Sequence, residues 1–211
     1  VSGTGRVFAY DSSGSIKVYD TSGTYLRSWA PVALPVQDMD ERPGGYVWVT
    51  YGQGAWPYDQ DGVALHDQYG YALCDFSLKA TGQFNQPSDL DFNSTGTVAV
   101  VDGTHPVQAF NHGMSLLATM PAGSAAVAVG TTGTVFTPHN RSVYRYSSSG
   151  SIETTWGGFG TGDGQLGNTI SGIALSPDQS HVYVSDSDNK RVQKFSPTGS
   201  YEGKWGAAGS G

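Results

Sequence analysis

The sequence predicts an all-β fold, a β-propeller of four-stranded antiparallel blades, and three observations support it. Glycine is abundant, with 30 among 211 residues, while only 14% of residues are charged. Short alternating runs of apolar and polar residues recur between turn residues, as expected of short strands. One sequence pattern recurs: an alternating run, an aromatic residue, a polar turn and a glycine. Its spacing, roughly 40–50 residues, is typical of propeller blades.

The glycine at the end of this pattern occurs in about five repeat units. These glycines are Gly23, Gly62, Gly113, Gly150 and Gly199. An earlier residue opens a strand at a nearly constant distance before each of them: Gly5, Gly45, Gly96, Gly133 and, in the last unit, Ser180. The constant distance indicates that one hairpin recurs in every unit of a single domain. The units cover residues 1–30, 31–80, 81–121, 122–157 and 158–206.

Each unit offers up to four strands, of which the second and third form this hairpin. The expected second strands are residues 6–10, 46–49, 97–101, 134–137 and 181–184. The expected first strands, nearest the propeller axis, are residues 36–40, 88–92, 125–129 and 172–175. The fourth strands should end near Trp29, around residues 75–80, and near Met120, Trp156 and Trp205. Alternation along these strands buries one blade face against the next, so the repeated aromatic residues are expected to be core.

The last unit has a glycine-rich lead-in at residues 162–166, then a strand, then the turn Asp-Ser-Asp-Asn-Lys-Arg over residues 186–191. It closes with an aromatic-glycine pair at Trp205 and Gly206. With these three features in this order, the unit resembles an NHL repeat. The third unit supplies a second lead-in at residues 82–87. The resemblance implies a propeller, which in this family usually has six blades.

The second and fourth units depart from the family pattern, with residues 51–53 and 138–140 where Asp-Ser-x-Asn is expected. The first unit begins at its second strand, so the chain lacks one inner strand. An open ring would leave sheet faces and edges bare. We therefore expect further chain or a neighbouring molecule to complete a ring of more than these five units. A compact five-bladed ring with a three-stranded first blade is the alternative.

Charge and composition exclude several classes of function. With 11 Lys and Arg residues and a net charge of −7, the chain lacks the basic surface that nucleic acid binding requires. No apolar run approaches the length of a membrane span, about 20 residues. Few lysines and many Ser, Thr, Gly and Tyr residues are typical of an extracellular or cell-surface protein. Asn93 and Asn140 each begin an N-glycosylation acceptor triplet, and the lone Cys74 excludes an internal disulfide.

Aspartates recur in the turn between second and third strands, at Asp11, Asp102 and Asp186. An aspartate in a turn accepts backbone N–H hydrogen bonds, and this structural role is favoured over catalysis. Arg191 is expected to pair with an aspartate or with carbonyl groups across this rim. The same rim, with Asn189, is a candidate partner-binding surface.

His105 and His139 fall in the same turn of adjacent units and are the weak candidates for a metal site. Relatives that cleave peptidyl-hydroxyglycine hold zinc with histidines from several blades. A catalytic zinc needs about three protein ligands, and a third suitably placed histidine is missing. We predict no catalytic metal and no other cofactor. Asp59 and Asp61 faintly resemble a calcium turn, but a plain hairpin is favoured.

Aromatic residues cluster in the second unit, at Trp48, Tyr51, Trp56 and Tyr58. They could present aromatic rings to a carbohydrate or a partner protein, although packing within an irregular blade is the favoured explanation. Two functions compete. One is a non-catalytic interaction or structural propeller within a larger secreted or surface protein, and the other is a metal-assisted lyase or hydrolase. Acidic charge and missing ligands favour the first.

Overall fold

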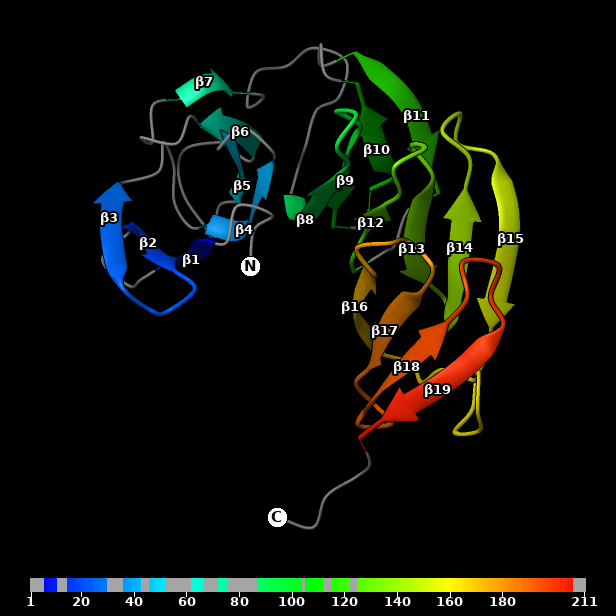
Figure 1. Ribbon diagram of the computed structural model, residues 1–211. Coiled ribbons are helices and arrows are strands. Elements are labelled where there is room, and N and C mark those ends of the chain that lie inside the picture. The colour runs from blue at the N-terminus through cyan, green and yellow to red at the C-terminus, as the bar shows by residue number, and fades with distance from the viewer. Residues whose placement is uncertain are drawn as a thin grey trace. The chain divides into compact units, whose positions relative to one another are not determined.

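A computed structural model of the chain shows strands and no helix among the described residues (Figure 1). These residues form two compact units, 1–90 and 91–211, and each is described by itself. The described residues are 6–10, 15–29, 36–42, 46–51, 62–66, 72–75, 87–103, 105–111, 115–121 and 125–206.

The first unit contains a three-stranded and a four-stranded antiparallel sheet. The first blade comprises β1 (Arg6–Tyr10), β2 (Ile16–Asp20) and β3 (Tyr25–Trp29). The second blade comprises β4 (Val36–Arg42), β5 (Tyr46–Tyr51), β6 (Gly62–His66) and β7 (Ala72–Asp75). Ile16 of the first blade packs in one fully buried cluster with Val47 and Val49 of the second. The two blades therefore bury one sheet face against the other.

The second unit contains three four-stranded antiparallel blades. The third blade, whose first strand begins within the first unit, comprises β8 (Pro87–Phe92), β9 (Val98–Asp102), β10 (Val107–Phe110) and β11 (Leu116–Met120). The fourth comprises β12 (Ala128–Val129), β13 (Val135–His139), β14 (Ser142–Tyr146) and β15 (Ile152–Gly157). The fifth comprises β16 (Ile170–Leu175), β17 (Val182–Asp186), β18 (Arg191–Phe195) and β19 (Tyr201–Trp205).

These sheets confirm the predicted all-β fold and its antiparallel, four-stranded blades, with a first blade that has three strands. The outermost strands β3, β11 and β19 end at the predicted residues Trp29, Met120 and Trp205. One difference is β12, which has two residues where five were expected. Ala126 and Val127 are buried without belonging to it, because the ladder with β13 begins only at Ala128.

The core of the second unit lies between its blades. Met120 and Val107 of the third blade pack with Val129 and Val135 of the fourth. On its other face, the fourth blade packs its Phe136 and other apolar residues against apolar residues of the fifth. The short strand β12 contacts both β9 and β16, and Figure 1 shows the sheet β12–β15 between its two neighbours. This face-to-face packing of successive sheets is the arrangement of propeller blades.

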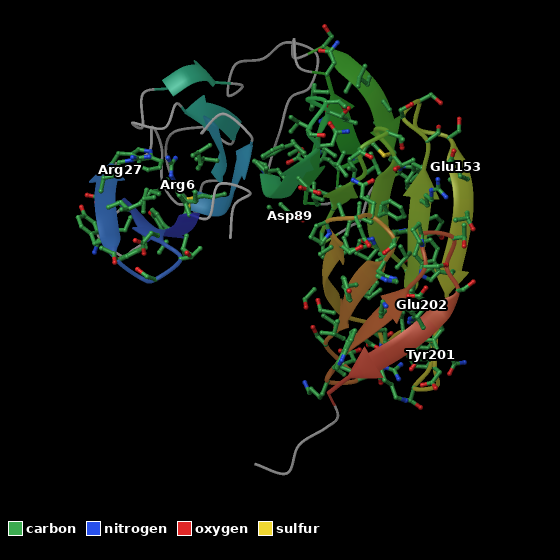
Figure 2. All side chains as sticks on the ribbon, in the orientation of Figure 1. Arg6, Arg27, Asp89, Glu153, Tyr201 and Glu202 are labelled. Carbon is green, nitrogen blue, oxygen red and sulfur yellow. The ribbon has the colours of Figure 1, made fainter. Side chains whose placement is uncertain are left out.

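Charged side chains on the outermost strands reach back to the strand beside them. Glu153 of β15 lies 3.1 Å from Arg145 of β14, and Glu202 of β19 lies 3.4 Å from Lys194 of β18 (Figure 2). These side chains are only partly buried, and such pairs contribute little to stability. They keep the outer strands polar where no further strand covers them.

A second link between blades runs through the turns that join first and second strands. Asn93 donates from Nδ2 to the carbonyl of Gly130 (2.8 Å), while its Oδ1 accepts the backbone N–H of Thr97 (2.9 Å). Gln179 of the fifth blade accepts the N–H of Thr131 from the other side (2.9 Å). The buried Nδ2 of Asn93 is therefore committed to the fold, whereas Asn140, the other candidate acceptor for a glycan, is exposed.

We expect Asn93→Ala to lower the free energy of unfolding by about 1–3 kcal/mol, because it leaves buried backbone groups without partners. Ser94→Ala is the matched control, since Ser94 is the exposed neighbour in the same turn. Urea denaturation followed by tryptophan fluorescence measures both. Equal stabilities of the two variants would contradict the assigned role of Asn93.

Candidate functional site

The rim of the second unit is formed by the turns that follow β9, β13 and β17. These strands end at Asp102, His139 and Asp186, so the three residues occupy the same position of successive blades. The sequence predicted that these residues lie in the same turn of their blades. The blades differ in the contacts and the burial of the side chain at this position.

In the fifth blade, Asp186 is fully buried and all its interactions are internal. Its Oδ1 accepts the N–H of Gly167 (3.0 Å). Its Oδ2 accepts hydrogen bonds from Asn189 Nδ2 (2.8 Å) and Arg191 Nε (2.9 Å). A buried carboxylate needs hydrogen-bond donors of this kind to offset its lost hydration. Asp186 is therefore a structural residue of the blade.

Arg191 holds the segment before β16 against the strands of the fifth blade. This segment, residues 158–169, extends the predicted glycine-rich lead-in on both sides and is called the lead-in from here on. Its Nη1 donates to the carbonyl of Thr161 (2.8 Å), and its Nη2 donates to the carbonyls of Gly162 (2.9 Å) and Gln165 (2.7 Å). Together with Asp186, these contacts confirm the predicted pairing of Arg191 with an aspartate and with carbonyl groups. The planar guanidinium fits such a set of acceptors, which a lysine could not reproduce.

Gln193 completes this buried polar network. Its Nε2 donates to the carbonyl of Gln165 (2.6 Å), and its Oε1 accepts the N–H of Gly164 (3.0 Å). Asn189 adds a bond from Nδ2 to the carbonyl of Gly160 (2.9 Å). The lead-in therefore has a fixed course over the rim of the fifth blade.

In the fourth blade, Asn140 and Arg141 form the tight turn between β13 and β14. Both have positive φ, 48° and 66°, as a two-residue hairpin of this type requires. Asn140 Nδ2 lies 2.7 Å from His139 Nε2, and the His139 ring lies 6.2 Å from that of Tyr144. The turn projects Asn140 and Arg141 to the surface of the rim.

A patch of exposed side chains joins this turn to the lead-in of the fifth blade. We call it the rim patch, and it comprises Arg141, Phe159 and Asn168. Arg141 donates from Nε to Asn168 Oδ1 (2.8 Å), and its guanidinium carbon lies 4.8 Å from the centre of the Phe159 ring. Phe159 is 64% exposed, the largest exposed fraction among the large apolar side chains described.

The backbone beneath the rim patch is held on both sides. Gly158 N–H donates to the carbonyl of Arg141 (2.8 Å), and Asn168 N–H donates to Asp188 Oδ2 (2.7 Å). Hydrogen bonds from Thr169 and Asn168 hold the pKa of the Asp188 carboxyl below its ordinary value. Asp188 is therefore an anion that anchors the loop at neutral pH, and the rim patch is presented on a fixed backbone.

In the third blade, Asp102 is fully buried while His105 is exposed. The N–H of His105 donates to the carbonyl of Asp102 (2.8 Å), and its Nδ1 lies 3.9 Å from Asp102 Oδ2. No three His, Cys, Asp or Glu side chains of the described residues come close enough together to hold a metal ion. The structure does not join His105 and His139 to a third ligand, and the absence of a catalytic metal stays a prediction.

Several predicted candidates lie wholly or partly outside the described residues. Trp48 and Tyr51 belong to strand β5, but their side chains lie outside them. The other such residues are Asp11, Trp56, Tyr58, Asp59 and Asp61. The aromatic cluster of the second blade and the faint calcium turn therefore stay predictions.

Sequence reasoning missed the rim patch. Phe159 stands between glycines in the lead-in, with Gly158 before it and Gly160 after it. Phe159 is a large apolar residue that lies outside every predicted strand, so it is not expected to pack between two blades. This mismatch is the sequence signal that could have identified it. The contact of Arg141 with Phe159 depends on a turn of one blade meeting the lead-in of the next.

The comparison with protein families agrees with this architecture. Residues 168–195, from the end of the lead-in to β18, match the NHL repeat. The strands β16, β17 and β18 of the fifth blade are therefore similar to an NHL repeat. Such a repeat indicates a β-propeller-type protein-interaction module. A search of curated proteins gave no match.

The NHL match covers the residues that form the buried polar network. It includes Asp186, Asn189, Arg191 and Gln193, whose contacts fix the lead-in. It includes Asn168 of the rim patch but excludes Arg141 and Phe159, so the contact between the guanidinium and the aromatic ring lies outside the matched residues. The described residues contain no helix with the length and apolar character that a membrane crossing needs.

Proposed function

We propose that the chain is a non-catalytic interaction propeller of a secreted or cell-surface protein, and that it binds a partner protein through the rim patch. The observation that carries this proposal is the exposed Phe159 ring under the Arg141 guanidinium. Aromatic and arginine side chains dominate the energetics of protein interfaces. The low content of basic residues and the many Ser, Thr, Gly and Tyr residues support an extracellular location.

The chemistry of the rim patch suits a partner segment with an apolar side chain beside a carboxylate. Among the described residues, Arg141 forms its hydrogen bond through Nε alone, so both Nη groups can meet an incoming carboxylate. The exposed face of Phe159 would receive the apolar side chain. Since the Nε bond to Asn168 already orients the guanidinium, little side-chain entropy is lost on binding.

Capture of partners from the secreted fraction of the source cells tests this function. Phe159→Ser should reduce capture of a specific partner at least about tenfold, the loss expected for a central aromatic contact. Ile152→Ser is the matched control, because Ile152 is 56% exposed on the outer strand β15, away from the rim turns. Equal capture by wild type and Phe159→Ser, or equal loss in both variants, would contradict the proposal.

A further inference from the structure

The turn between β13 and β14 carries an N-glycosylation acceptor triplet, Asn140-Arg141-Ser142. Asn140 is exposed, and its Nδ2 lies 2.7 Å from Nε2 of His139. An amide nitrogen carries two hydrogens, and only one of them is needed for the bond to the imidazole. The second hydrogen of Nδ2 meets no acceptor among the described residues, so a sugar could replace it without breaking a contact.

The other acceptor triplet, residues 93–95, lies in the turn between β8 and β9 and has no room for a sugar. Asn93 is only 5% exposed, and its Nδ2 points at the carbonyls of Gly130 (2.8 Å) and Thr131 (3.5 Å) in the fourth blade. A sugar on this nitrogen would enter the contact between the third and fourth blades. The fold therefore tolerates a glycan at Asn140 and excludes one at Asn93.

The two side chains at the tip of the β13–β14 turn leave it toward different blades, all within the second unit. Asn140 lies beside His139, whose ring is 6.2 Å from that of Tyr144. Tyr144 packs against the core between the third and fourth blades. Arg141 lies instead against the other two residues of the rim patch, which belong to the lead-in of the fifth blade. A glycan on Asn140 would stand on the third-blade side of the turn and leave the rim patch open.

We propose that Asn140 carries an N-linked glycan, a modification that rests on the secreted or cell-surface location proposed above. Nδ2 of Asn140 forms a bond to the anomeric carbon of an oligosaccharide that is supplied as a lipid-linked glycosyl diphosphate. The bond from that carbon to the diphosphate oxygen breaks, the diphosphate leaves with the electron pair, and Nδ2 loses one proton. The hydrogen that remains on Nδ2 keeps the bond to His139.

The glycan restricts how a partner reaches the rim patch. An N-linked glycan is bulky and hydrated. Beside Arg141, it blocks any partner surface that extends from the rim patch over the rim of the third blade. A partner segment that runs along the lead-in of the fifth blade avoids it. The modification therefore selects partners that approach from the fifth blade.

Mass spectrometry of the protein from the secreted fraction of the source cells tests the modification. A peptide N-glycosidase releases the oligosaccharide and converts the asparagine that carried it to aspartate, which identifies the position. We expect the glycan on Asn140 and none on Asn93. Ser142→Ala should abolish the mass shift, because it destroys the acceptor triplet and leaves Asn140 in place. Thr95→Ala, which destroys the other triplet, is the matched control and should keep the shift.

A secreted protein without a glycan on Asn140, or with one on Asn93, overturns the proposal. Partner capture separates the modification from the function on which it rests. Phe159→Ser should carry the glycan and lose the partner, whereas Ser142→Ala should lack the glycan and capture the partner as wild type does. Loss of capture in Ser142→Ala overturns the placement of the glycan away from the rim patch. A glycan on Asn140 with equal capture by wild type and Phe159→Ser supports the modification and contradicts the rim patch alone. An unmodified protein found only inside the cells overturns both the modification and the proposed location.

Discussion

Replacing Asp186 with alanine is expected to lower the free energy of unfolding of the second unit by about 3–5 kcal/mol, because it leaves a buried arginine without its counter-ion. The side chains of Asp186 and Arg191 are both almost fully buried, and their oxygen and nitrogen lie 2.9 Å apart. The loss also frees the N–H of Gly167 and the amide of Asn189. Urea denaturation and thermal melting measure the change.

A surface ion pair in the same blade is the matched control for Asp186→Ala. Asp163 and Lys204 lie 2.5 Å apart, but both are exposed. Water screens such a pair, so Asp163→Ala should melt at nearly the wild-type temperature. If Asp163→Ala and Asp186→Ala were equally destabilised, burial of the Asp186 network would not be what stabilises the blade.

The Asp186 network also fixes the lead-in that presents Phe159. Limited proteolysis should therefore cut residues 158–169 faster in Asp186→Ala than in wild type, under conditions where the strands remain folded. Partner capture through the rim patch should fall with it. Asp186 would then support partner binding only indirectly, because it keeps the backbone of the lead-in ordered.

The strands were predictable because alternation and turn glycines are local signals. The run at residues 6–10, for example, alternates and follows Gly5, and β1 covers the same residues. The short β12 was harder to predict, because small apolar residues such as Ala126 are buried near the axis whether or not they belong to a ladder. The periodicity of apolar residues indicates which residues are buried, but it does not indicate which residues hydrogen-bond to a neighbouring strand.

The candidate site was predictable only in part, because its geometry depends on contacts between blades. The turn position of Asp102 and Asp186 follows from the repeat, and so does the pairing of Arg191. The contact of Arg141 with Phe159 joins a hairpin of one blade to the lead-in of another, and no spacing in the sequence specifies it. The same limit applies to the exposure of Trp205, which shares its sequence position with Trp156.

Replacing Gly199 with alanine is expected to destabilise the fold by about 2–5 kcal/mol, through two separate effects. An alanine at φ +92° adopts a left-handed conformation, which costs about 1–2 kcal/mol. The added Cβ would also lie 2.7 Å from the Trp156 ring and 2.8 Å from its Cβ. Those atoms lie close to the backbone of β15, so the blades must separate, and overpacking of this kind costs about 1–3 kcal/mol.

Gly164→Ala separates these two effects, because it has the first without the second. Gly164 lies in the same blade with φ +78°, but its Cβ would meet only Tyr201, at an ordinary 3.7 Å. We expect Gly164→Ala to cost about 1–2 kcal/mol, the conformational part alone. The difference between the two variants in urea denaturation then measures the packing of Trp156 on the glycine turn. If the two variants are equally stable, Trp156 does not press against that turn.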